Sequence, residues 1–127
     1  MRFSYTTNLS EVRALAGEQA KMAGLTDARV ADFVIAVSEV AANTVRHARS
    51  PGSMEIWCDA DELVCEIRDA GVIANPQASR RPPPPGATGG HGLWLVHEVC
   101  DQVELHSDEN GTVIRMHMSL REGRRFG

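Results

Sequence analysis

The chain contains a single lysine among its 127 residues, Lys21, and this scarcity excludes two large classes of nucleotide-binding protein. A P-loop ends in Gly-Lys-Ser or Gly-Lys-Thr, and a eukaryotic-type protein kinase places a strand lysine on the phosphates of its nucleotide. Lys21 follows Gln19 and Ala20 in a helical pattern and meets neither requirement. If the protein handles a nucleotide, it does so by another route.

Long apolar runs and clustered basic residues are also absent. No apolar stretch approaches the ~20 residues that a membrane span needs, and residues 1–5 lack the apolar segment of a secretory signal. We therefore expect a cytoplasmic protein without membrane contact. The formal net charge is -4, and the basic residues are scattered except in the tail, which argues against direct binding of nucleic acid.

The three cysteines, Cys58, Cys65 and Cys100, form no CxxC pair. An odd number of cysteines without a secretory signal predicts reduced, buried thiols rather than disulfides or zinc ligands. With 43% hydrophobic residues, a chain of this length can bury roughly two-thirds of its unfolded surface. We expect a single domain over residues 1–127, with a frayed tail at 120–127.

Apolar periodicity predicts the order strand, helix, helix, strand, strand, long loop, helix, strand, strand. Helices interleaved with hairpins are typical of a two-layer α+β sandwich. The expected elements are a strand at Arg2–Thr7, a helix from Asn8 or Ser10 to about Ala23, a helix from Thr26 or Asp27 to about Arg49, a hairpin of Met54–Asp59 and Leu63–Arg68, a helix at Leu93–Cys100, and a hairpin of Val103–Ser107 and Thr112–Met118.

The region at about 70–90 has turn and coil chemistry, with four consecutive prolines at 82–85 and glycines at 86, 89 and 90. About twenty residues without periodicity are unusual inside a compact domain and often form a functional lid. A linker between two small domains is the alternative. We favour a lid, because neither half of the chain alone could close a core.

Glu39, Asn43 and His47 recur every four residues in the second predicted helix. Successive members of such a series shift by about 40° and rise about 6 Å, so they form one polar stripe along the edge of the apolar face. A carboxylate there can deprotonate a nucleophile, and an amide oxygen suits Mg²⁺. An ordinary solvated helix face is the alternative, and His47 has no role that we can assign. The apolar face consists of Val30, Phe33, Val34, Val37, Val40, Ala41 and Val45.

Two further motifs follow. Asp69 and Gly71 end a predicted strand, where a buried carboxylate can accept from an exocyclic amine and a glycine lets the backbone approach a flat base; a plain turn is the alternative. Gly89-Gly90-His91-Gly92 leads into a helix, whose exposed N–H groups and dipole favour an anion. A flexible loop is the alternative there. A Rossmann fingerprint is excluded, because it should directly follow a strand in the first βα turn.

Taken in order, these motifs resemble those of the GHKL superfamily of ATPases and kinases, and the resemblance covers nearly the whole chain. The matches are an N box at Glu39-x-x-x-Asn43, a first glycine box at Asp69-x-Gly71, a second at Gly90-x-Gly92-Leu93, and a threonine near the adenine at Gly111-Thr112. The segments 38–43 and 92–96 look like those of actinobacterial anti-sigma regulatory kinases.

The resemblance implies the Bergerat ATP-binding fold: a two-layer α/β sandwich with a mixed, mostly antiparallel sheet, helices on one face and an ATP lid. It also implies a role for each matching residue. Glu39 would activate the acceptor hydroxyl, Asn43 would ligate Mg²⁺, Asp69 would bond the adenine amine with help from Thr112, Gly71 would lie near the base, and Gly90, Gly92 and Leu93 would contact the phosphates. One departure is Ile73, where the family often has a second glycine.

The function implied by this resemblance is that of an anti-sigma factor and protein-serine kinase. Such a protein uses ATP to phosphorylate an anti-anti-sigma antagonist of the STAS type and sequesters a sigma factor. Two alternatives stay open: a binding module that switches partners without phosphotransfer, and a histidine-kinase catalytic domain. Homodimers are common among these kinases, and some relatives carry the domain after a sensory domain, but no motif here decides either point.

Overall fold

The computed structural model describes residues 2–5, 8–47, 52–71 and 91–121. Most of the expected lid, including Gly90 and Ile73, and most of the expected tail lie outside these residues. In chain order the elements are β1 (Arg2–Tyr5), α1 (Leu9–Met22), α2 (Asp27–His47), β2 (Gly52–Asp59), β3 (Glu62–Asp69), α3 (His91–Val99), β4 (Gln102–Asp108) and β5 (Gly111–Ser119). This is the order that the periodicity predicts.

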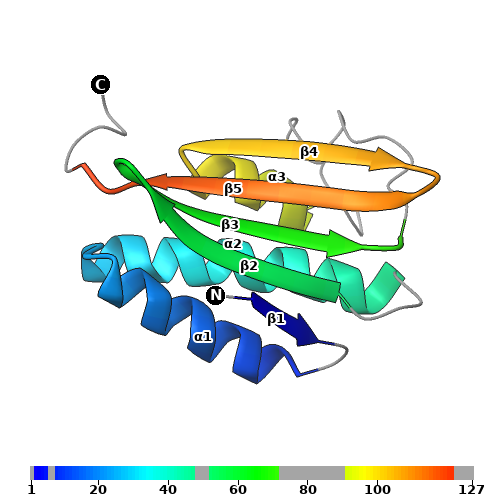
Figure 1. The fold of residues 1–127 in the computed structure, drawn as a ribbon, viewed down its shortest axis with the longest axis horizontal. Coiled ribbons are helices and arrows are strands. Elements are labelled where there is room, and N and C mark those ends of the chain that lie inside the picture. Colours follow the sequence, from blue (N-terminus) through cyan, green and yellow to red (C-terminus); the bar gives the residue numbers. More distant parts are fainter. Residues whose placement is uncertain (1, 6–7, 48–51, 72–90, 122–127) are drawn as a thin grey trace.

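The five described strands form one sheet in the order β1-β2-β3-β5-β4, and all pairings between them are antiparallel. The three helices lie on one side of the sheet (Figure 1). The predicted α+β sandwich with helices on one face is therefore confirmed. Strand β3 is central, because β2 pairs with one of its edges and β5 with the other.

Local signals set the helix ends. The Asn8 side chain accepts a hydrogen bond from the backbone N–H of Glu11 at 3.1 Å, so Asn8 rather than Ser10 caps α1. Gly24, at φ +94°, follows the end of this helix in the left-handed region that glycine adopts without strain. The Thr26 hydroxyl accepts from the backbone N–H of Arg29 at 3.3 Å and caps α2. None of the described helices is long and apolar enough to cross a membrane.

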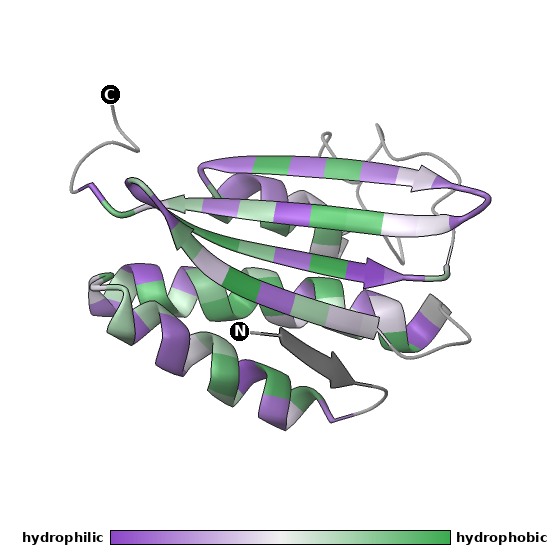
Figure 2. Cartoon of the chain, in the orientation of Figure 1, coloured by the Kyte–Doolittle hydropathy of each residue, from purple (hydrophilic) through white to green (hydrophobic). Residues whose placement is uncertain are grey.

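The core lies between the helices and the inner face of the sheet. Hydrophilic and hydrophobic residues alternate along β4, as expected for a strand with one buried face (Figure 2). The largest side chains with less than 2% exposure include an aromatic ring from α2 and apolar side chains from both hairpins: Phe33, Met54, Ile56, Leu63, Ile67, Met116 and Met118.

The three cysteines are free thiols, but they are not all buried. Cys65 and Cys100 belong to the core, and burial raises the pKa of the Cys65 thiol well above its ordinary value, helped by Cys100 and Glu66. Cys58 is exposed, so the prediction of burial is wrong for this residue. It lies one residue before the end of β2, and the two residues that follow it, Asp59 and Ala60, are exposed as well.

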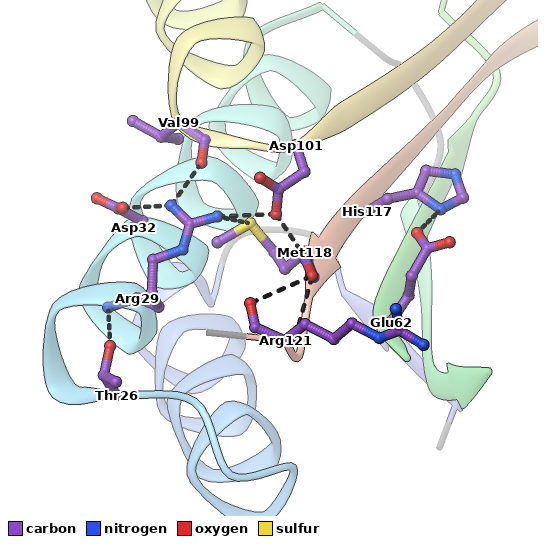
Figure 3. A network of polar contacts seen from close by, with 10 residues as sticks. Thr26, Arg29, Asp32, Glu62, Val99, Asp101, His117, Met118 and Arg121 are labelled. Carbon is purple, nitrogen blue, oxygen red and sulfur yellow. Dashed lines mark hydrogen bonds and ion pairs between the residues drawn. The ribbon is translucent and has the colours of Figure 1, made fainter. Parts of the chain in front are cut away.

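Arg29 joins the start of α2 to the end of α3 (Figure 3). Its Nη1 donates to Asp32 at 2.7 Å and to the carbonyl of Val99 at 3.0 Å, and its Nη2 donates to Asp101 at 3.0 Å. The Asp101 carboxylate also accepts from the backbone N–H of Ser119 at 2.6 Å. These contacts fix the C-terminal end of α3 against α2 and β5.

Candidate functional site

The polar stripe of α2 meets the first turn of α3. Glu39 and Asn43 are both half-buried, and Gly92 lies directly against Glu39. A Cβ atom added to Gly92 would come within 2.5 Å of Glu39 Oε2 and 3.5 Å of its Cδ. A side chain at position 92 would therefore displace the carboxylate, so glycine allows α3 to begin beside Glu39. Leu93 is partly buried and packs against the core.

Asp69, at the end of β3, is held by two short hydrogen bonds. Its Oδ2 accepts from the Thr44 hydroxyl at 2.7 Å, and its Oδ1 accepts from the backbone N–H of Gly71 at 2.7 Å. The second bond closes an Asx turn, in which an aspartate bonds the backbone two residues ahead. The carboxylate is half-buried and its orientation is fixed from two sides. Thr44 comes from α2, immediately after Asn43, so this bond joins two of the predicted motifs.

Thr112 lies opposite Asp69 in the pairing of β3 with β5 and is 3% exposed. Its hydroxyl donates to the carbonyl of Gly71 at 2.7 Å. Because that bond uses the only hydroxyl hydrogen of Thr112, Ser107 must be the donor in the 2.8 Å contact between the two hydroxyl groups. The orientation of Thr112 is therefore set, and it presents only acceptor character to a neighbour.

Gly111 brings the start of β5 close to Asp69. Its φ is +129°, which L side chains rarely adopt, and an added Cβ would collide with the backbone oxygen of Asp69. The Asn-Gly turn signal predicted a hairpin at this position, and the pairing of Asp108 with Gly111 confirms it. The same glycine also permits the close approach between Thr112 and the end of β3.

Within the described residues, the motifs contact one another in pairs. Glu39 adjoins Gly92, Thr44 (the residue after Asn43) bonds to Asp69, and Thr112 bonds to Gly71. Gly90 is the predicted site residue outside the described part of the chain. His47 is the last residue of α2, and its side chain lies outside the described part of the chain.

Sequence reasoning missed Thr44 and Ser107. Thr44 had a detectable signal, because it lies seven residues after Val37 and four after Val40, on the apolar face of α2. A threonine on a buried face is normally hydrogen-bonded, so its position predicted a polar partner in the core. Ser107 carried no such signal, since serine is common near a hairpin turn.

The described residues alone supply few ligands for a metal at this site. Asn43 offers one amide oxygen, and no group of three His, Cys, Asp or Glu residues suited to a metal occurs within the described ranges. Mg²⁺ commonly keeps several waters and takes the remaining ligands from one or two side chains and from substrate phosphates. The residues therefore fit a Mg²⁺ that arrives with a nucleotide better than a permanently bound metal.

The uncovered face of the sheet carries a separate hollow of about 270 Å³ that contains none of the predicted site residues. Glu66 lies there with 7% of its side chain exposed, bonded to Arg115 at 2.6 Å and to Arg68 at 3.0 Å. Burial alone would raise the pKa of Glu66, but the hydrogen bonds and charges of Arg115 and Arg68 outweigh it and hold the pKa below its ordinary 4.5. The lining residues are Glu66, Arg68, Glu104, Leu105, His106, Val113 and Arg115.

Solved structures share this fold at low sequence identity. The RsbU and RsbW domains of Rv1364c from Mycobacterium tuberculosis align with a TM-score of 0.63 and 17% identity over 94% of this chain and 32% of that one. The Acinetobacter baumannii histidine kinase AdeS aligns with a TM-score of 0.62 and 13% identity, over 96% of this chain and 68% of AdeS. The nucleotide-free catalytic domain of the histidine kinase ThkA aligns with a TM-score of 0.58 and 14% identity, over 94% of this chain and 95% of the ThkA domain.

The chain spans about a third of the Rv1364c structure but nearly all of the ThkA catalytic domain. No curated protein sequence matches it. The sequence profile of the histidine kinase-like ATPase domain matches residues 4–118, which include every element from the first helix to nearly the end of β5. Together with the GHKL motifs that meet around α2, this match shows that the chain belongs to the histidine kinase-like ATPase domain family of the GHKL superfamily.

Proposed function

We propose that the domain binds Mg-ATP at the junction of α2, the end of β3 and the start of α3, and acts as an anti-sigma factor with protein-serine kinase activity. Its substrate is an anti-anti-sigma protein of the STAS type, and its second partner is a sigma factor. Since sigma factors act in the cytoplasm, the proposal places the domain there.

The contact between Glu39 and Gly92 is the observation that carries this proposal. Gly92 is the second residue of α3, whose N-terminal N–H groups and positive dipole end favour phosphate. A carboxylate beside that position is well placed for a hydroxyl that attacks the terminal phosphate, whereas it would repel the phosphate itself. A domain that only bound nucleotide would gain nothing from an acidic group there, so this juxtaposition favours catalysis.

Each residue of the proposed site has a separate role in binding or in phosphotransfer. Asp69 accepts from the amine of adenine, and Gly71 lets the base approach the backbone. Asn43 offers its oxygen to Mg²⁺, which neutralises phosphate charge when bound. Glu39 takes the proton of the acceptor serine as the serine oxygen bonds to the γ-phosphorus, and the bond from that phosphorus to the bridging oxygen breaks to release ADP.

The RsbW domain of the Rv1364c structure supports the anti-sigma type of kinase, while AdeS and ThkA are histidine kinases. One experiment separates these functions. The purified domain is incubated with γ-labelled Mg-ATP and a panel of purified STAS-domain proteins, and the transferred label is tested for stability in acid and in base.

We expect label on a STAS protein that survives acid and is removed by base, as phosphoserine behaves, and that disappears when the acceptor serine is replaced by alanine. Acid-labile, base-stable label would identify a histidine kinase instead. Calorimetric binding of Mg-ATP without any transfer would indicate a partner-switching module. Absence of binding at millimolar nucleotide would end the proposal.

A further inference from the structure

The hydroxyl of Thr44 is a buried donor aimed at the candidate base-recognition residue. Thr44 is 3% exposed on the apolar face of α2, next to fully buried Ala41. It donates to Asp69 Oδ2 at 2.7 Å, whereas its contact with the carbonyl of Val40, one turn earlier, is a much longer 3.4 Å. The bond to the Asp69 carboxylate is therefore the stronger of these two.

Asp69 is held as an acceptor in one orientation. Thr44 occupies one lone pair of Oδ2, and the backbone N–H of Gly71 occupies one lone pair of Oδ1. A carboxylate has about four lone-pair positions, so each oxygen can still accept another hydrogen bond. The two existing bonds, one from α2 and one from the following turn, restrict rotation of the side chain before any ligand arrives.

Thr112, the register partner of Asp69, likewise presents a hydrogen-bond acceptor rather than a donor. Thr112 gives its hydrogen to the carbonyl of Gly71 and receives one from Ser107, so a ligand can meet only its remaining lone pair. Asp69 and Thr112 therefore both present acceptors around Gly71. An amino group can donate to such a pair, but a carbonyl oxygen at the same place meets lone pairs and leaves them unpaired.

Building on the nucleotide site proposed above, we propose that Thr44 is a positioning residue that fixes Asp69 as an acceptor and thereby sets the preference of the site for 6-aminopurines over 6-oxopurines. Thr44 acts through Asp69 and touches no base itself. Without its hydroxyl, Oδ2 loses its donor and the carboxylate can rotate. Part of the binding free energy of a 6-aminopurine is then spent in restoring the orientation.

The consequence differs between two nucleotides. ATP carries the 6-amino group and gains from a pre-oriented Asp69. Inosine triphosphate has the same sugar and phosphates but a 6-oxo group, so it lacks the 6-amino donor that Asp69 accepts, and its affinity should depend little on the orientation of Asp69. A general loosening of α2 would instead weaken both nucleotides alike, because they share the phosphate contacts.

The test measures the dissociation constants of Mg-ATP and Mg-ITP by calorimetry for wild type, Thr44→Val and Thr44→Ser. We expect wild type to prefer ATP by roughly 10- to 100-fold. Thr44→Val keeps the volume of the side chain but removes its hydrogen-bond donor. It should weaken the binding of Mg-ATP by about 3- to 10-fold and leave the binding of Mg-ITP nearly unchanged. Thr44→Ser keeps the hydroxyl and should restore most of the preference. Thr44→Ala carries the same expectation as Thr44→Val if the valine variant fails to fold.

Thr26→Val is the matched control, because it removes a threonine hydroxyl bond from the other end of the same helix. It should lower stability while leaving the ratio of ATP to ITP affinity unchanged. If wild type prefers ATP but Thr44→Val weakens both nucleotides equally, or neither, the role of Thr44 is wrong and the nucleotide site stands. If wild type binds neither nucleotide, the nucleotide site itself is wrong.

Discussion

Gly92 and Glu39 lie so close that the glycine cannot take a side chain without moving the carboxylate, since an added Cβ would be 2.5 Å from Glu39 Oε2. The obstructing atom is the end of a flexible side chain rather than backbone, so the carboxylate would give way and the fold would not. This pair therefore offers a substitution that separates catalysis from stability.

We predict that Gly92→Ala folds normally but transfers phosphate poorly. Alanine in a helix is favoured over glycine by about 1 kcal/mol, which offsets much of the local strain. Thermal unfolding should change little, while the displaced Glu39 should lower the rate of phosphotransfer toward that of a Glu39 variant. Wild-type transfer by Gly92→Ala, at unchanged stability, would show that the position of the Glu39 carboxylate does not matter.

Substitutions of Glu39 and Asn43 should impair nucleotide binding and phosphotransfer to different extents. Glu39→Gln keeps the size of the side chain beside Gly92 but cannot take a proton, so the rate of transfer should fall by about 10²- to 10⁴-fold while Mg-ATP binding stays near wild type. Asn43→Ala removes the oxygen offered to Mg²⁺ and should weaken binding and transfer together. Calorimetry and single-turnover labelling measure the two effects, and Glu18→Gln, at an exposed position of α1, serves as the control. Equal loss of binding in both variants would contradict the division of roles.

Arg29→Lys should destabilise the domain by about 1–3 kcal/mol, because an ammonium cannot reproduce a planar fork that serves Asp32, Val99 and Asp101 together. Urea unfolding measures the change. Arg46→Lys, an exposed arginine on the same helix, is the control and should be neutral. A neutral Arg29→Lys would mean that the end of α3 is held by packing alone.

Glu66 should make stability depend on acid pH. Its pKa in the folded state is held below the ordinary 4.5 by Arg115 and Arg68, so the folded state favours the charged carboxylate. The resulting stability is fully present above pH 4.5 and is lost as the pH falls below that value through the folded-state pKa. Thermal unfolding of wild type and Glu66→Gln should therefore differ at about pH 7 and converge toward about pH 3. A difference that does not change with pH would rule out this linkage.

The helices, the strands and the motif positions could be predicted from the sequence, because each leaves a local pattern of residues. Residue type predicts the caps at Asn8 and Thr26 and the hairpin turn before Gly111. Apolar periodicity predicts the buried face of α2. Glu39, Asn43 and Asp69 were recognised because their motifs, taken in order, resemble those of the GHKL superfamily, and the structure places Thr44, the residue after Asn43, in contact with Asp69.

What the sequence did not reveal depends on neighbours that are distant along the chain. Thr44 looks like part of an apolar helix face until Asp69 is placed opposite it. Glu66 alternates outward with solvated residues, yet it is buried because arginines from its own strand and from β5 close over it. Cys58 has the alternation of a core residue, but burial ends before it on β2, so the alternation alone overestimates the core.

The pairing of β3 with β5 has a consequence for how this domain can diverge. Asp69 and Thr112 are register partners, with Gly111 and Val113 on either side of Thr112. A slip of β5 by one residue would place one of these two, neither of which has a hydroxyl, opposite Asp69 and would turn every side chain of β5 to the other face of the sheet. The register of this one pair of strands therefore ties the packing of the core to the hydrogen bonds around Gly71, and a mutation that shifts one shifts the other.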